Sequence, residues 1–124
     1  SNPDISIVIR TLNEERYLAD LLSGIKEQRT DFNHEIILID SGSTDETLSI
    51  AKQFGCRILH ISRTDFSFGR SLNRACEASQ GQFLVFVSGH CIPYDQHWLQ
   101  NQQRLTSRHL LTRSQFLQLS LRPL

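Results

Sequence analysis

The chain has 124 residues, of which 39% are hydrophobic, and 13 Lys and Arg residues balance 13 Asp and Glu residues. This length suits one domain with a modest core and excludes a second full domain. The balanced charge excludes nucleic acid or an acidic membrane surface as an expected partner, because both attract proteins with an excess of basic residues.

Four short runs rich in Ile, Val and Phe predict strands, at 5–9, 36–39, 57–61 and 83–87. Three runs are nearly continuous, which is typical of strands buried on both faces of a parallel sheet. The run at 57–61 alternates in polarity, so we expect it at a sheet edge. None of the runs approaches the ~20 residues of a membrane span, and no signal-peptide pattern is present.

The segments between these runs predict helices. The first and third helices each carry one apolar stripe with i, i+3, i+4, i+7 spacing. The second is predicted to begin with a capping box of Ser43 and Glu46 and to end at Gly55 in a left-handed conformation. The two stripes are Leu18, Leu21, Leu22 and Ile25, and Leu72, Ala75, Cys76 and Ser79.

Alternation of strand and helix predicts an α/β fold with right-handed crossovers and a parallel sheet. After Trp98 the pattern changes: residues 100–124 carry only a loose helical stripe that includes Phe116 and Leu117, and no further strand is predicted. We therefore expect a helical or poorly ordered C-terminal tail.

Polar residues follow the first and second predicted strands, at the edge where parallel sheets bind ligands. Thr11 and Asn13 can offer donors and acceptors to a heterocycle, and Asn13 is equally suited to capping the next helix. Asp40 either faces the ligand crevice, where it can accept a base N–H or a ribose hydroxyl, or caps a turn. The alternatives for Asn13 and Asp40 stay open here.

Two later loops also carry candidate residues. Arg70 opens the third helix, with Asn73 one turn further on, and a helix amino end with an arginine can hold a phosphate; a surface arginine is the alternative. His90 follows the fourth strand, where a neutral imidazole can bind a divalent metal or serve a structural role.

Four segments together resemble the family 2 glycosyltransferases: IVIRTLNEE, EIILIDSGSTDET, FGRSLNRA and GQFLVFVSGHCIPYDQHWL. The resemblance implies a Rossmann-like GT-A three-layer sandwich with a mostly parallel sheet, truncated after the fourth strand, in which residues 3–99 form the nucleotide-sugar-binding half. It also implies transfer of a sugar from a UDP or dTDP donor to an acceptor hydroxyl, with Mg or Mn bridging the diphosphate.

The resemblance assigns the donor site residue by residue. It implies that Thr11, Asn13 and Glu14 lie beside the base and ribose, and Asp40 beside the uracil or thymine. The full donor-binding set is Thr11, Asn13, Glu14, Asp40, Ser41, Arg70, Asn73 and Ser88, and His90 is the implied metal ligand.

Two positions depart from the family pattern. Ser41 stands where much of the family has a second aspartate that bonds the base, and the resulting Asp-Ser-Gly-Ser segment is similar to that of rhamnosyltransferase-like members. Ser88-Gly89-His90 stands where the family has Asp-x-Asp for the metal. His90 keeps a ligand atom but Ser88 loses a charge, so Mg or Mn is expected to bind weakly.

No Asp or Glu occurs between residues 96 and 124, although the family's catalytic base lies downstream of the metal motif. We therefore expect no catalytic residue in this chain, a truncated enzyme and little activity by itself. The alternative is a non-catalytic nucleotide or nucleotide-sugar binding module. A flavodoxin-like or receiver-type domain is disfavoured because Ser41 and Ser88 occupy positions where a receiver needs acids.

The remaining expectations concern partners and location. The full-length enzyme would act on a carbohydrate or a lipid-linked acceptor, and an exposed sheet edge left by the missing half would promote a homo-oligomer. Three cysteines without a CxxC pair favour a reducing compartment, so the expected location is cytoplasmic, including the inner face of the membrane.

Overall fold

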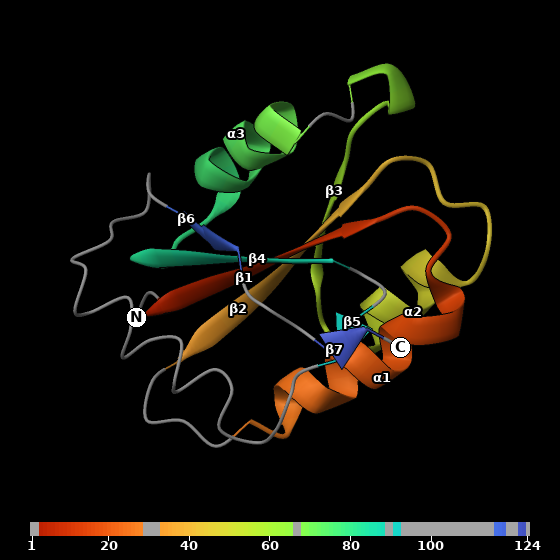
Figure 1. The fold of residues 1–124 in the computed structure, drawn as a ribbon, viewed down its shortest axis with the longest axis horizontal. Helices are drawn as coiled ribbons and strands as arrows, with labels where there is room; N and C mark the ends of the chain where they lie inside the picture. Colours follow the sequence, from red (N-terminus) through yellow and green to blue (C-terminus); the bar gives the residue numbers. More distant parts are fainter. Residues whose placement is uncertain are drawn as a thin grey trace.

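The computed structural model describes residues 3–28, 33–65, 68–88, 91–92, 116–118 and 122–123. Its main sheet has the strand order β3-β2-β1-β4-β6, and all of its neighbouring strands run parallel (Figure 1). The strands are β1 (Ile5–Thr11), β2 (His34–Asp40), β3 (Arg57–His60), β4 (Phe83–Ser88) and β6 (Phe116–Gln118). The predicted α/β class and parallel sheet are confirmed, and β3 occupies the expected edge.

Three helices connect the strands: α1 (Glu15–Lys26), α2 (Thr47–Gln53) and α3 (Phe68–Ala78). Side chains alternate across a strand, so β1 and β2 each supply residues to both faces of the sheet. One buried cluster joins Ile7 and Leu38 to the stripe of α1 and to Ala51 of α2. The other joins Val8 and Ile37 to Ala75 of α3. Two cores on opposite faces make the predicted three layers.

The beginning of α2 differs from the predicted capping box. The helix starts at Thr47, and its N-cap is Glu46, whose own side chain makes no capping hydrogen bond. Ser43 instead belongs to the preceding loop, where Asp40 engages its hydroxyl and backbone amide. The predicted end is confirmed, because Gly55 has a φ of 76° directly after the helix.

The segment 116–118 corrects the expectation of a sheet that stops at its fourth strand. Residues Phe116–Gln118 form β6, which pairs parallel with β4 between Leu84 and Phe86. A three-residue strand has too few positions to be separated from a helical stripe by periodicity, so the sequence pattern missed it. Short elements elsewhere are η1 (Arg63–Asp65), β5 (Cys91–Ile92) and β7 (Arg122–Pro123), of which β5 and β7 pair antiparallel. None of the helices in the described part of the chain combines the length and the hydropathy that a membrane crossing requires.

Candidate functional site

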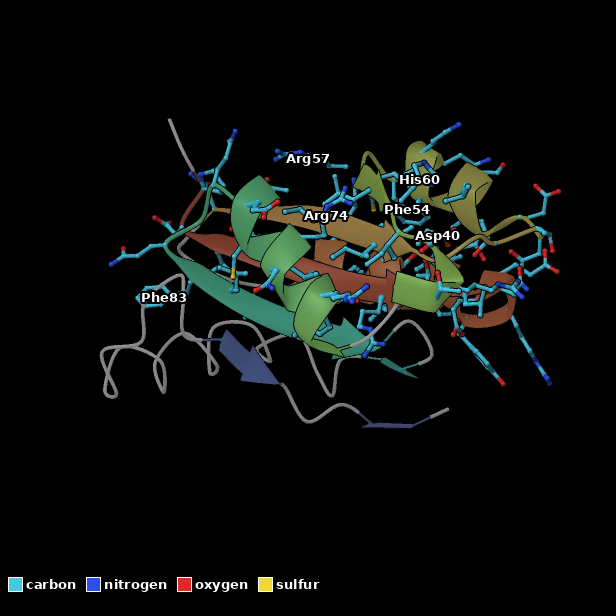
Figure 2. All side chains as sticks on the ribbon, turned by 90° about the horizontal axis from the view of Figure 1, so that it is seen from above. Asp40, Phe54, Arg57, His60, Arg74 and Phe83 are labelled. Carbon is cyan, nitrogen blue, oxygen red and sulfur yellow. The ribbon has the colours of Figure 1, made fainter. Side chains whose placement is uncertain are left out.

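The carboxyl ends of β1 and β2 bring Thr11 and Asp40 together. They are partners in the strand register, and the Thr11 hydroxyl donates to Asp40 Oδ1 at 2.7 Å. The amide of Ser41 then donates to the Thr11 carbonyl at 3.1 Å. Asp40 also pairs in register with His60 of β3, and Figure 2 shows both at the same end of the sheet, opposite Phe83. The sequence prediction that these strands run side by side in one direction is confirmed.

Asp40 organises the loop that follows β2. It is fully buried, and its oxygens accept hydrogen bonds from the hydroxyls of Thr11 and Ser43 and from the amides of Gly42 and Ser43. Burial acts to raise the pKa of Asp40, but the hydrogen bonds from Ser43, Thr11 and Gly42 outweigh it, and the net pKa is lowered. Gly42 has a φ of 105°, which only glycine adopts readily, so the turn closes around the carboxylate. This geometry is the turn-capping alternative of the sequence analysis.

Asn13 bridges the loops after β1 and β2 rather than capping α1. Its φ is 54°, its side-chain oxygen accepts the Thr44 amide at 2.8 Å, and its own amide donates to the Ser43 hydroxyl at 2.9 Å. The N-cap residue of α1 is Glu14, without a side-chain cap. Of the two alternatives for Asn13, capping of α1 is therefore wrong. Because Asn13 is exposed between two fixed loops, it remains a candidate for contact with a ligand.

The amino ends of α1 and α2 cap each other with acidic side chains. Asp45 accepts the amides of Glu15 at 3.2 Å and of Thr47 at 2.9 Å, and Glu15 accepts the amide of Glu46 at 3.1 Å. The amide of Glu14 donates to the Thr47 hydroxyl at 2.8 Å. Helix amino ends usually attract anions, but here protein carboxylates occupy several of the free amides. This side of the carboxyl edge is therefore an acidic rim, formed by Glu14, Glu15, Asp45 and Glu46.

A basic pocket lies on the other face of the sheet, between the end of β3 and α3. It has a volume of about 280 Å³ and is lined by Ile61, Arg70, Asn73 and Arg74. The pocket adjoins the Asp40 loop, because the Ile61 amide donates to the Asp40 carbonyl at 2.9 Å. Arg74 Nη1 donates to the His60 carbonyl at 3.4 Å, and Figure 2 shows Arg74 on α3 over the sheet. Two predicted residues, Arg70 and Asn73, are thus brought together with an arginine that the sequence analysis missed.

Arg74 and Arg63 are the basic residues that the sequence analysis did not single out. Arg74 lies four positions after Arg70, which puts both on one side of a helix, and this spacing was a usable signal. Arg63 lies in η1 beside the Asp40 loop: a Cβ placed on Gly42 would be 3.9 Å from Arg63 Nε. No sequence pattern connects Arg63 to that loop, because the contact depends on the path of the chain after β3.

The predicted metal motif is only partly within the described residues. Ser88 is the last residue of β4, and Arg10 of β1 is its register partner. The side chain of Ser88 and the whole of His90 lie outside what the structure describes. Within the described part of the chain, no group of three His, Cys, Asp or Glu side chains is arranged to hold a metal ion.

Comparisons with known proteins place this geometry in context. The model of the family described as "Glycosyl transferase family 2" matches residues 6–110. The PGL/p-HBAD biosynthesis glycosyltransferase of Mycobacterium bovis (strain BCG / Pasteur 1173P2) is 38% identical over 89 residues, which cover 68% of this chain and 34% of that protein.

Two solved structures are similar as well. The crystal structure of Staphylococcus aureus TarS 1–349 in complex with UDP-GlcNAc has a TM-score of 0.71 at 23% identity, over 86% of this chain and 32% of that one, which supports the fold alone. The structure of Mycobacterium tuberculosis glucosyl-3-phosphoglycerate synthase with Mn²⁺, UDP and glucosyl-3-phosphoglycerate has a TM-score of 0.66 at 29% identity, over 89% of this chain and 40% of that one. The chain spans between 15% and 40% of the length of these relatives, with the lowest share for the full-length Staphylococcus aureus TarS.

Proposed function

The chain belongs to glycosyl transferase family 2, and we propose that its carboxyl edge binds the nucleotide part of a UDP-sugar or dTDP-sugar donor. In the whole protein the sugar would pass to an acceptor hydroxyl on a carbohydrate or a lipid-linked molecule, in the cytoplasm. UDP in the similar Mycobacterium tuberculosis structure supports the donor class. The chain's own residues then have the task of holding and orienting the nucleotide diphosphate.

The observation that carries this proposal is the contrast between the two sides of the carboxyl edge. The acidic rim repels a diphosphate and has several of its helix-end amides engaged, whereas Arg70 and Arg74 offer guanidinium donors on the α3 side and Arg63 lies beside the Asp40 loop. The pocket volume of about 280 Å³ is at the lower end for small-molecule sites, so it suits the diphosphate rather than a whole nucleotide. We therefore assign the diphosphate to Arg70 and Arg74, with Asn73 as a further hydrogen-bonding group.

The base and ribose would lie over the loops after β1 and β2. Asn13 and Glu14 border this area, and the Ser41 hydroxyl is 3.4 Å from the Thr11 carbonyl. Asp40 would have to release one of its four hydrogen bonds to contact the base directly. Its principal role in this proposal is to hold Thr11 and the 41–43 loop in place, and a direct contact with the base stays a prediction.

The proposal also includes a divalent metal ion that binds together with the donor. Mn²⁺ accompanies UDP in the Mycobacterium tuberculosis structure, and Mg or Mn bound with the donor would neutralise diphosphate charge. His90 would be the protein ligand and the diphosphate would supply most of the remaining oxygens. The Asp40 carboxylate accepts four hydrogen bonds from protein donors and does not fit a metal ligand.

Calorimetric titration with UDP, dTDP and GDP, each with and without Mn²⁺, tests the proposal. We expect UDP and dTDP to bind, with Mn²⁺ increasing affinity, and His90→Ala to abolish only the Mn²⁺ effect. An unchanged Mn²⁺ effect in His90→Ala would remove His90 from the site. Absence of binding by any nucleotide would overturn the function and leave the fold.

A non-catalytic nucleotide-binding module is the alternative, and Ser88 at the position of a family aspartate favours it. The two functions differ in metal dependence. Nucleotide binding of equal strength with and without Mn²⁺ would support the module, and binding strengthened by Mn²⁺ supports the transferase donor site.

A further inference from the structure

A second cavity lies at the amino edge of the sheet, away from the Asp40 loop. Its volume is about 300 Å³, and it is bordered by Lys26 at the end of α1, His34 and Glu35 at the start of β2, Phe54 after α2, and Arg57 at the start of β3. These residues come from four consecutive elements, so the cavity is a product of the fold rather than of one loop. No role for this cavity follows from membership of glycosyl transferase family 2.

The charges at this cavity do not cancel. Among the described residues that border it, Glu35 is the single carboxylate, and its oxygens already accept hydrogen bonds from the Ser6 hydroxyl at 2.6 Å, the Gln80 amide at 2.7 Å and Arg57 Nη1 at 3.3 Å. Among the described residues Lys26 forms no ion pair, and its ammonium instead lies 5.8 Å from the centroid of the Phe54 ring. Lys26 and Arg57 thus contribute two positive charges against one engaged negative charge.

The ends of α1 and α2 also point toward this edge, and helix carboxyl ends carry partial negative charge. Several of their last carbonyls are already occupied. Those of Ser23, Gly24 and Ile25 accept hydrogen bonds from Glu27 and Gln28, and those of Ile50, Ala51 and Lys52 accept the amides of residues 54–56. Because these carbonyls already accept hydrogen bonds, their partial negative charge offsets little of the positive charge of Lys26 and Arg57.

The pKa of His34 reflects the same excess of positive charge. Burial and then the positive charge of Lys26 lower the pKa of His34, so the imidazole is neutral at neutral pH. In the described part of the chain, the charged groups that border the cavity with it are Lys26 on α1, Glu35 on β2 and Arg57 on β3. An anion held between Lys26 and Arg57 would favour the protonated imidazole and raise its pKa.

We propose that this amino-edge cavity is a binding site for a small organic anion: one phosphate or carboxylate head on a compact apolar body. Lys26 and Arg57 bind the head, with His34 as a third donor once protonated. The Phe54 ring and the Ile36 side chain, both part of the cavity wall, contact the body. The volume of about 300 Å³ admits one aromatic ring with its charged group but no nucleotide sugar.

Titration of the full chain with phenyl phosphate, benzoate and inorganic phosphate tests this site, with the His34 ring resonances followed by NMR. We expect phenyl phosphate to bind more tightly than inorganic phosphate, because the latter lacks the apolar body, and to raise the pKa of His34. The comparison with benzoate decides between phosphate and carboxylate as the preferred head. No binding of any probe at millimolar concentration would overturn the site.

Matched variants locate the binding. Lys26→Gln should weaken the binding of phenyl phosphate by about tenfold or more, as expected for a lost charged hydrogen bond. Lys52→Gln removes an exposed lysine outside the cavity wall and should not change the binding of phenyl phosphate. Equal weakening in both variants would show non-specific charge attraction and overturn the proposal. So would competition by UDP, or weakening by Arg74→Gln, since both would place the anion at the carboxyl edge. The outcome for the amino-edge cavity does not depend on whether UDP binds at the carboxyl edge.

Discussion

The Thr11 hydroxyl donates to Asp40 Oδ1 at 2.7 Å, and this contact joins residues 29 positions apart at the carboxyl ends of two adjacent parallel strands. The same oxygen engages the Ser43 hydroxyl, which in turn accepts the Asn13 amide. One buried carboxylate therefore couples the loops after β1 and β2. Any ligand bound over these loops meets a surface whose shape depends on Asp40.

Asp40→Asn is expected to destabilise the protein by about 2 kcal/mol, because an amide group cannot accept all four hydrogen bonds and would turn its own donors toward neighbouring donors. Urea unfolding followed by circular dichroism measures the change. Asp20→Asn, at an exposed position of α1, is the control and should stay within about 0.5 kcal/mol of the parent. Equal stability of Asp40→Asn and the parent would contradict the assigned role.

Acid should destabilise the protein in two steps. The pKa of His34 is lowered from its usual 6.5, so the unfolded chain binds more protons and stability declines as pH falls below that value. Hydrogen bonds lower the pKa values of Glu35 and Asp40 despite burial, so a second decline begins near pH 4.5 and continues as these carboxylates are protonated in the folded state. Thermal unfolding between pH 8 and pH 3 measures both steps.

Glu35→Gln tests how much Glu35 contributes to the decline in stability below pH 4.5. The variant loses charged acceptors for Ser6, Gln80 and Arg57, so we expect it to be less stable at pH 7 and to show a shallower decline below pH 4.5. Glu77→Gln, which removes an exposed carboxylate of α3, should keep the slope of the parent. A parent-like slope in Glu35→Gln would mean that Glu35 has no lowered pKa in the folded protein.

Gly81→Ala is expected to destabilise the protein by about 1–3 kcal/mol through overpacking. A Cβ at this position would lie 2.6 Å from the backbone nitrogen of Ser6 and 2.7 Å from the Ile5 carbonyl carbon, and neither backbone atom can move without shifting the central strand. Gly69→Ala is the matched control: no atom lies within 4 Å of its Cβ, so alanine should stabilise α3 by about 0.5–1 kcal/mol. Equal effects of the two substitutions in thermal unfolding would refute the steric argument.

Arg74→Gln should weaken UDP binding by about tenfold while leaving the much weaker binding of uridine unchanged, because uridine carries no phosphate. Calorimetry at two salt concentrations measures both, and the dependence of UDP affinity on salt should decrease in the variant. Arg16→Gln, at an exposed arginine of α1 away from the pocket, should behave like the parent. Loss of uridine binding in Arg74→Gln would move the base, rather than the diphosphate, into this pocket.

The local pattern of apolar residues in the sequence was sufficient to predict the layers of the fold. Strands buried on both faces are nearly continuous in apolar residues, and burial recurs every three to four residues along helices, so the runs at 5–9 and 36–39 and the stripe from Leu18 to Ile25 could be interpreted without knowing what they pack against. Parallel strands in turn place Thr11 and Asp40 at one edge, which is why the proximity of these two residues could be predicted.

Only the tertiary structure decided which polar groups pair at that edge. Ser43 could cap α2 or bind Asp40, and Asn13 could cap α1 or bridge to Thr44. The Ser43–Asp40 contact closes the loop after β2, and the Asn13–Thr44 contact joins that loop to the loop after β1. Arg74 and Arg63 likewise depend on how α3 and η1 pass over the sheet. The physical reason is that apolar burial requires only a periodic pattern along the chain, whereas a hydrogen bond requires one particular partner, and here the partners are mostly about 30 residues away.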